Sequence, residues 1–61
     1  MPIVDVKLVE GRSEEQKREM AKKITDTLVE DGGAKAEAVT VIFHDLKDHD
    51  FSKSGKLFKD L

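Results

Sequence analysis

The sequence has no cysteine, only one proline, no long apolar run and no excess of basic charge. Without cysteine, disulfide bonds and thiolate metal sites are excluded, although these commonly stabilise very small proteins. Acids and bases are interspersed at a net charge of -2, so no basic surface is expected to bind nucleic acid. No stretch is long enough to span a membrane, and the charged segment VDVKLVEGR cannot form the core of a signal peptide. These absences predict a cytoplasmic protein without a nucleic-acid or membrane partner.

The length of the chain predicts one small domain, residues 1–61, with a thin core. At this size folding hides only roughly 60% of the surface that the unfolded chain exposes. Because no disulfide can compensate, we expect oligomerisation to supply the missing burial.

A strand followed by a helix is predicted in the first half of the chain. Over residues 3–9, β-forming apolar residues alternate with charged ones, which is typical of a strand with one buried face. Ser13 and Gln16 have the spacing of a capping box, so a helix should begin with Ser13 as its N-cap. The helix should end near Asp31, because a glycine of the Gly32-Gly33 pair can supply the positive φ of a C-cap. Its apolar stripe consists of Met20, Ala21, Ile24 and Leu28.

A second strand is predicted over residues 39–43, which are apolar on both faces of the pleat. Such strands are usually buried on both sides, as in a parallel sheet. The predicted fold class is therefore α/β (α+β), a βαβ unit followed by a loop or short hairpin over residues 46–59. Neighbouring subunits are the simplest cover for the remaining large apolar residues, which are Phe43, Phe51, Leu57, Phe58 and Leu61.

The only proline, Pro2, directly precedes the first predicted strand. Proline is tolerated there because its missing N–H breaks no ladder bond. A functional interpretation requires removal of Met1, since the Pro2 nitrogen then becomes a secondary amine. An N-terminal amine has an unperturbed pKa of roughly 7.7 to 8.0, and an apolar pocket near a cation lowers it. A base whose pKa lies near the working pH is suited to abstracting and returning a proton.

Several segments of the chain resemble the 4-oxalocrotonate tautomerase family of the tautomerase superfamily. They are Pro2 before a strand, Leu8-Val9-Glu10-Gly11-Arg12-Ser13, Glu15-Gln16-Lys17 at the helix start, and Phe51. The resemblance runs without gaps over nearly the whole chain and is more specific in its N-terminal part. It implies a βαβ subunit with a C-terminal hairpin, dimers that share a four-stranded sheet, and a homohexamer built as a trimer of dimers. It also implies cleavage of Met1 and a cofactor-independent tautomerase, in which Pro2 is the general base that moves a proton within the enol or dienol of a small 2-oxo acid.

The resemblance gives roles to four further residues. Arg12 matches the arginine that binds the substrate carboxylate, for which the guanidinium fork offers two charge-assisted hydrogen bonds. Phe51 matches the aromatic lining of the active site, and Val9 an apolar residue beside the pocket. Thr40 departs from the pattern, because the best-studied type of the family has there a second arginine that polarises the carbonyl. Losing such a donor costs roughly 2.7 to 4 kcal/mol in the transition state, so we expect a substrate other than the dicarboxylate muconate.

Other interpretations of these residues remain open. Taken alone, Arg12 would be interpreted as a surface residue at the helix entry and Phe51 as part of the core. Thr40 also fits a non-catalytic oligomeric binding module on the same scaffold. A proline-dependent hydratase or dehalogenase is a further alternative, and it would need an acid such as Asp5 or Asp45 near Pro2.

The segment HDLKDHD, residues 44–50, superficially suggests a metal site. Its first two residues, His44 and Asp45, point to opposite faces of a strand, and the segment offers no i, i+4 ligand pair on a helix. We therefore predict a solvated acidic loop and no metal.

Overall fold

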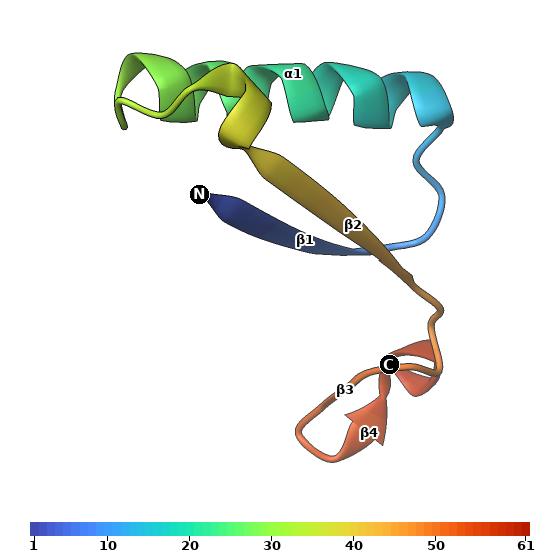
Figure 1. Ribbon diagram of the computed structural model, residues 1–61. Helices are drawn as coiled ribbons and strands as arrows, with labels where there is room; N and C mark the ends of the chain where they lie inside the picture. Colours follow the sequence, from blue (N-terminus) through green and yellow to red (C-terminus); the bar gives the residue numbers. More distant parts are fainter.

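The computed structural model describes residues 1–61 as a strand, a helix, a second strand and a small C-terminal hairpin (Figure 1). The elements are β1 (Ile3–Val9), α1 (Glu14–Glu30), the short 3-10 turn η1 (Ala36–Ala38), β2 (Thr40–Leu46), β3 (Ser52–Lys53), β4 (Lys56–Leu57) and the 3-10 turn η2 (Phe58–Asp60). The predicted βαβ unit with a C-terminal hairpin is confirmed. None of the helices has the length and apolar character that crossing a membrane requires.

Strands β1 and β2 pair in parallel, with Ile3 opposite Thr40 and Val9 opposite Leu46. The predicted alternation in β1 is confirmed, because its half-buried residues, among them Val4, alternate with exposed ones up to Leu8. Strand β2 is longer than predicted and continues to Leu46. Its polar C-terminal residues stay in the strand because β1 offers them a backbone partner at every position.

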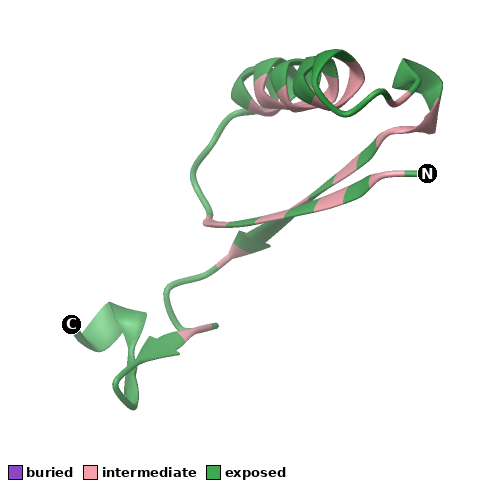
Figure 2. Cartoon of the chain, turned by 90° about the vertical axis from the view of Figure 1, so that its left-hand side faces the viewer, coloured by how far each residue is buried: buried purple, intermediate pink, exposed green.

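Helix α1 begins as the sequence predicts. The Ser13 N–H donates to Gln16 Oε1 at 2.8 Å, and the Gln16 N–H donates to Ser13 Oγ at 3.1 Å, which completes the capping box. The helix ends at Glu30, and Gly33 has the expected positive φ of 70°. Gly32 is required for a different reason, since a Cβ there would lie 2.7 Å from the Leu28 carbonyl oxygen. The apolar stripe predicted for the helix is half-buried against the sheet (Figure 2).

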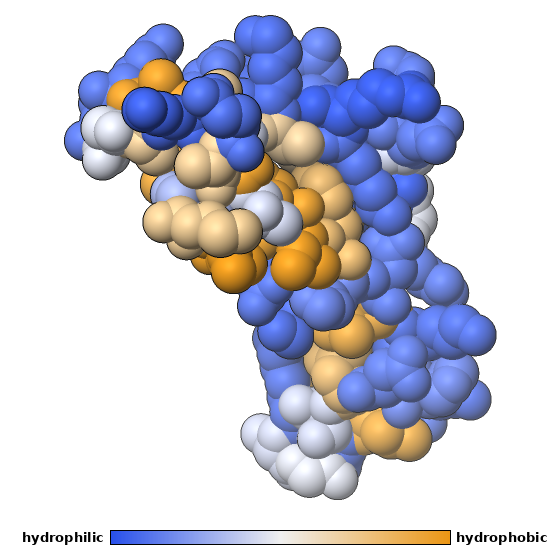
Figure 3. Space-filling view, viewed as in Figure 1, coloured by the Kyte–Doolittle hydropathy of each residue, from blue (hydrophilic) through white to orange (hydrophobic).

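The other face of the sheet is uncovered within one chain. Ile3 is 60% exposed and Ile42 is 40% exposed on that face, and no residue of the chain is fully buried. The prediction that the second strand is buried on both faces is therefore wrong for the single chain. The only long helix of the chain covers just one face of the sheet. Hydrophobic side chains gather over the strands, with a smaller group on the hairpin (Figure 3).

The chain is also far from spherical. Its radius of gyration is 14.6 Å and its extents are 42 × 24 × 14 Å. A compact domain of this length has a radius of gyration of about 10.5 Å. The hairpin projects away from the sheet and helix, which accounts for the long dimension (Figure 1).

Candidate active site

Pro2 lies at the N-terminal end of the sheet, directly before β1. It is half-buried, and its carbonyl accepts a hydrogen bond of 3.0 Å from the N–H of Thr40, the exposed first residue of β2. While Met1 is attached, the Pro2 nitrogen is a tertiary amide that has neither a proton nor basicity. Met1 is 93% exposed, so its removal loses almost no packing contacts with the rest of the chain. The backbone position of Pro2 is thus fixed independently of Met1.

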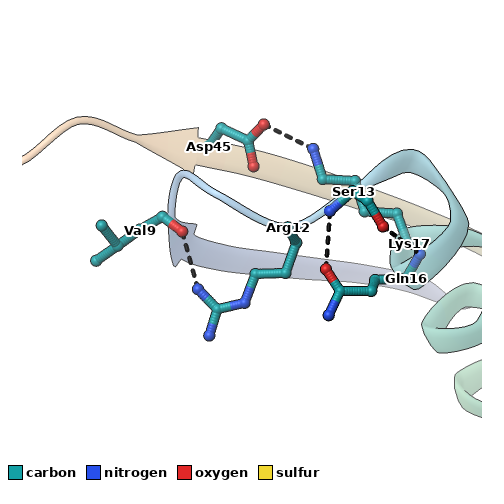
Figure 4. A network of polar contacts seen from close by, with 6 residues as sticks. All are labelled: Val9, Arg12, Ser13, Gln16, Lys17 and Asp45. Carbon is teal, nitrogen blue, oxygen red and sulfur yellow. Dashed lines mark hydrogen bonds and ion pairs between the residues drawn. The ribbon is translucent and has the colours of Figure 1, made fainter.

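Arg12 lies at the opposite end of the sheet, in the loop that joins β1 to α1 (Figure 4). Its Nη1 donates to the carbonyl of Val9 at 3.0 Å, and the N–H of Glu10 donates to the Leu46 carbonyl at 2.8 Å. The arginine side chain has five N–H donors, so its Nε–Nη2 edge remains for a second partner. This exposed edge has the geometry that binds a carboxylate through two hydrogen bonds.

Phe51 lies in a third place, at the base of the C-terminal hairpin. Its ring stacks on Phe58 with a centroid distance of 4.7 Å and an interplanar angle of 24°. The Phe58 N–H donates to the Phe51 carbonyl at 3.0 Å, which holds the two residues together. The hairpin projects from the body of the chain, so this aromatic pair lies apart from the sheet and the helix (Figure 1).

One chain brings these residues together only in pairs. Pro2 meets Thr40 at one end of the sheet, and Arg12 meets Val9 at the other. With a rise of about 3.3 Å per residue along β1, roughly 23 Å separate Pro2 from Val9. The single chain has no pocket. A site that uses both Pro2 and Arg12 therefore needs a second chain.

The acidic segment of residues 44–50 is divided between the end of β2 and a turn. His49 in the turn lies 3.6 Å from Asp48 and 3.8 Å from Asp50, and all three are exposed. The Lys47 N–H donates to the Asp50 carboxylate at 3.0 Å, which closes the turn. No group of three His, Asp or Glu side chains has an arrangement that could hold a metal ion.

An ion pair that the sequence does not predict joins the helix to the sheet. Lys17 Nζ in the first turn of α1 lies 2.6 Å from Asp45 Oδ2 near the end of β2 (Figure 4). The two residues are 28 positions apart, and neither helical nor strand periodicity relates them.

Comparisons with known proteins agree with this architecture. The model of a protein family described as "Tautomerase enzyme" matches residues 2–61. The 2-hydroxymuconate tautomerase of Bacillus subtilis (strain 168) is 36% identical over 61 residues, which cover 100% of this chain and 98% of the relative. A probable tautomerase of Bacillus cereus is 38% identical over 60 residues, which cover 98% of this chain and 98% of the relative.

Solved structures share the fold over almost the whole chain. The crystal structure of YwhB, a homologue of 4-oxalocrotonate tautomerase, has a TM-score of 0.92 at 35% identity and covers 98% of both chains. A second homologue of 4-oxalocrotonate tautomerase has a TM-score of 0.89 at 33% identity and covers 100% of this chain and 97% of its own. The family and the fold that the resemblance implies are confirmed. The chain belongs to the tautomerase family and is an isomerase of the 4-oxalocrotonate tautomerase type.

Proposed function

We propose that this protein is a cofactor-independent tautomerase that interconverts the enol or dienol and keto forms of a small 2-oxo acid. Pro2 is the general base after removal of Met1. The observation that carries the proposal is the placement of Pro2, which is half-buried, bonded through its carbonyl to Thr40 and next to an exposed Met1. The family match begins at Pro2 and leaves Met1 outside, which supports the same assignment.

The proposed reaction needs only one proton-carrying group. The neutral Pro2 amine takes a proton from the dienol and becomes a secondary ammonium. It then returns a proton to carbon, which yields the conjugated ketone and regenerates the amine. Because one proton is removed and one is returned, without any change in oxidation state, the step requires no cofactor.

In this proposal, Arg12 and Thr40 determine how many carboxylates the preferred substrate carries. The free edge of Arg12 binds one carboxylate, while Thr40 is neutral at the Pro2 end of the sheet. Because Thr40 carries no positive charge, it cannot pair with a second carboxylate at that end. We therefore propose a dienol with a single carboxylate as the preferred substrate. Phe51 and Val9 supply apolar lining that keeps the amine in a dry environment.

We propose that residues 1–61 form one tautomerase domain that acts only as an oligomer. A compact monomer of 6.8 kDa has a surface of about 3,950 Å². This chain has 4781 Å², and the excess is close to the roughly 800 Å² that each partner buries in a standard interface. A homohexamer built as a trimer of dimers would cover the bare sheet face and place Arg12 of one subunit near Pro2 of another. The cytoplasmic location stays a prediction.

The two alternative functions, a hydratase or dehalogenase and a non-catalytic binding module, make different demands on the residues near Pro2. A hydratase or dehalogenase needs an acid near Pro2, yet Asp45 is bonded to Lys17 at the Arg12 end of the sheet. Asp5 lies on the uncovered face, 3.6 Å from His44. A non-catalytic binding module, suggested by Thr40, would show no proline-dependent turnover of any enol acid.

Ultraviolet absorbance tests the proposal by following the ketonisation of a 2-hydroxydienoate with one carboxylate and of 2-hydroxymuconate. The protein is first shown by intact mass to lack Met1. We expect turnover of both, faster for the monoacid, and loss of turnover in a Pro2→Ala variant that circular dichroism shows to be folded. Equal rates in Pro2→Ala and the parent chain would refute the role of Pro2.

A further inference from the structure

The ion pair between Lys17 and Asp45 is unlike every other side-chain hydrogen bond in the chain. All the others join residues three or four positions apart, whereas this one spans 28 positions and joins α1 to β2. The Lys17 side chain is 26% exposed and that of Asp45 is 41% exposed. Fully exposed ion pairs stabilise proteins little, but this pair is partly covered and its two members are on rigid elements.

The pair lies beside the loop that carries Arg12. On the strand side, the loop is bonded to β2 through the Glu10 N–H and the Leu46 carbonyl, at 2.8 Å. On the helix side, the first turn of α1 is bonded to β2 through Lys17 and Asp45, at 2.6 Å. Asp45 and Leu46 are consecutive residues, so the start of the Arg12 loop and the first turn of α1 are attached to the same short piece of strand.

The capping box fixes Ser13 to the first turn of α1, but Gly11 and Arg12 before it are held less firmly. Gly11 has a φ of 132°, which a side chain rarely permits, and no atom beyond its two neighbouring residues lies within 4 Å of the place where its Cβ would be. Arg12 itself is exposed and contacts only the Val9 carbonyl through a hydrogen bond. The separation between the end of β1 and the start of α1 therefore depends on how the first turn of α1 is held against β2.

We propose that Lys17 and Asp45 are positioning residues that hold the Arg12 guanidinium in place for a substrate carboxylate. This inference rests on the proposed function, in which Arg12 binds that carboxylate. A carboxylate that does not react is bound equally in the ground state and the transition state. Loss of its alignment therefore raises KM and leaves kcat nearly unchanged.

The test compares Lys17→Met, Asp45→Asn and the double variant in the full-length, Met1-free, assembled protein. The matched controls are Lys22→Met and Asp26→Asn, which break an exposed pair of the same residue types with an N–O distance of 3.2 Å on α1. We expect KM for the monoacid dienol to rise about fivefold in each single variant, with no further rise in the double variant, because the two residues act as one unit. The controls should keep the parent KM.

Rescue and binding measurements separate positioning from a purely structural role. The reversed pair, Lys17→Asp with Asp45→Lys, should restore KM toward the parent value. Where Asp45→Asn does not assemble, Asp45→Glu gives the comparison, with a KM between those of the parent and Lys17→Met. A melting temperature that falls in the Lys17 and Asp45 variants while KM stays at the parent value would overturn the proposal.

The role of Arg12 is tested separately by Arg12→Ala. If Arg12→Ala raises KM and the Lys17 and Asp45 variants do not, the positioning inference fails while the proposed function stands. If Arg12→Ala leaves KM unchanged, the proposed carboxylate site itself fails. Calorimetric titration with a saturated monocarboxylic 2-oxo acid gives the same comparison as Kd values without relying on turnover.

Discussion

The separation between Pro2 and Arg12 predicts that each active site uses residues of two chains. Along β1 the two ends of the sheet lie roughly 23 Å apart, a distance that no small 2-oxo acid spans. Pro2→Ala and Arg12→Ala should therefore complement each other when they are mixed in one oligomer. At a dienol concentration well below KM, each variant alone should be nearly inactive, because Pro2→Ala removes the base and Arg12→Ala removes the carboxylate anchor and so raises KM.

The size of the recovery follows from random mixing of equal amounts of the two variants. A site is intact when its Pro2 comes from an Arg12→Ala chain and its Arg12 comes from a Pro2→Ala chain. About one quarter of the sites meet both conditions if the subunits assemble at random in a closed symmetric oligomer. The variants are unfolded together, refolded and assayed for ketonisation of the monoacid dienol.

Controls make the complementation result decisive. Each variant refolded alone reports its residual rate, and the parent protein taken through the same cycle gives the full rate. If both residues of a site belonged to one chain, no mixed oligomer would contain an intact site. A mixture no more active than the sum of its separate components would therefore refute the two-chain site.

The bare sheet face, the end of α1 and the Pro2 amine can each be tested by a further measurement. Ile42→Lys places a charge on the bare sheet face, where desolvating an unpaired ion costs several kcal/mol, so light scattering should show smaller species than for the parent; an unchanged mass would contradict burial of that face. Gly32→Ala puts a Cβ 2.7 Å from the Leu28 carbonyl oxygen, so it should lower the free energy of unfolding by about 1 to 3 kcal/mol in thermal melts, whereas an unchanged melting temperature would contradict the close approach. Because only the neutral Pro2 amine is a base, kcat/KM should rise with pH and level off at or below about pH 8, and a flat profile between pH 5 and 9 would argue against it.

Local signals in the sequence were sufficient to predict the main elements. The alternation of apolar and charged residues fixes the face that β1 turns to the helix. Ser13 and Gln16 fix the first turn of α1 because both halves of the capping box lie within four residues. The extension of β2 to Leu46 was not predictable in this way, because the backbone of β1, and not the side chains of β2, holds those residues in the strand.

The candidate site depends on information that local patterns do not contain. Pro2 and Arg12 were identified through the resemblance to a family, since proline at a strand start and arginine at a helix entry are common in structural roles. The pairing of Lys17 with Asp45 depends on how α1 lies on β2, which no spacing rule gives. Local patterns also do not show which sheet face stays uncovered, because nothing in this chain packs against that face.

The proposed chemistry depends on the free amine of Pro2, and a comparison of two forms of the chain tests this dependence. The same chain is prepared with and without Met1, both forms are verified by intact mass, and their rates of ketonisation of the monoacid dienol are measured at equal concentration. We expect turnover only in the form that begins with Pro2, since Met1 converts the nitrogen into a non-basic amide. Equal turnover in the form that retains Met1 would contradict it.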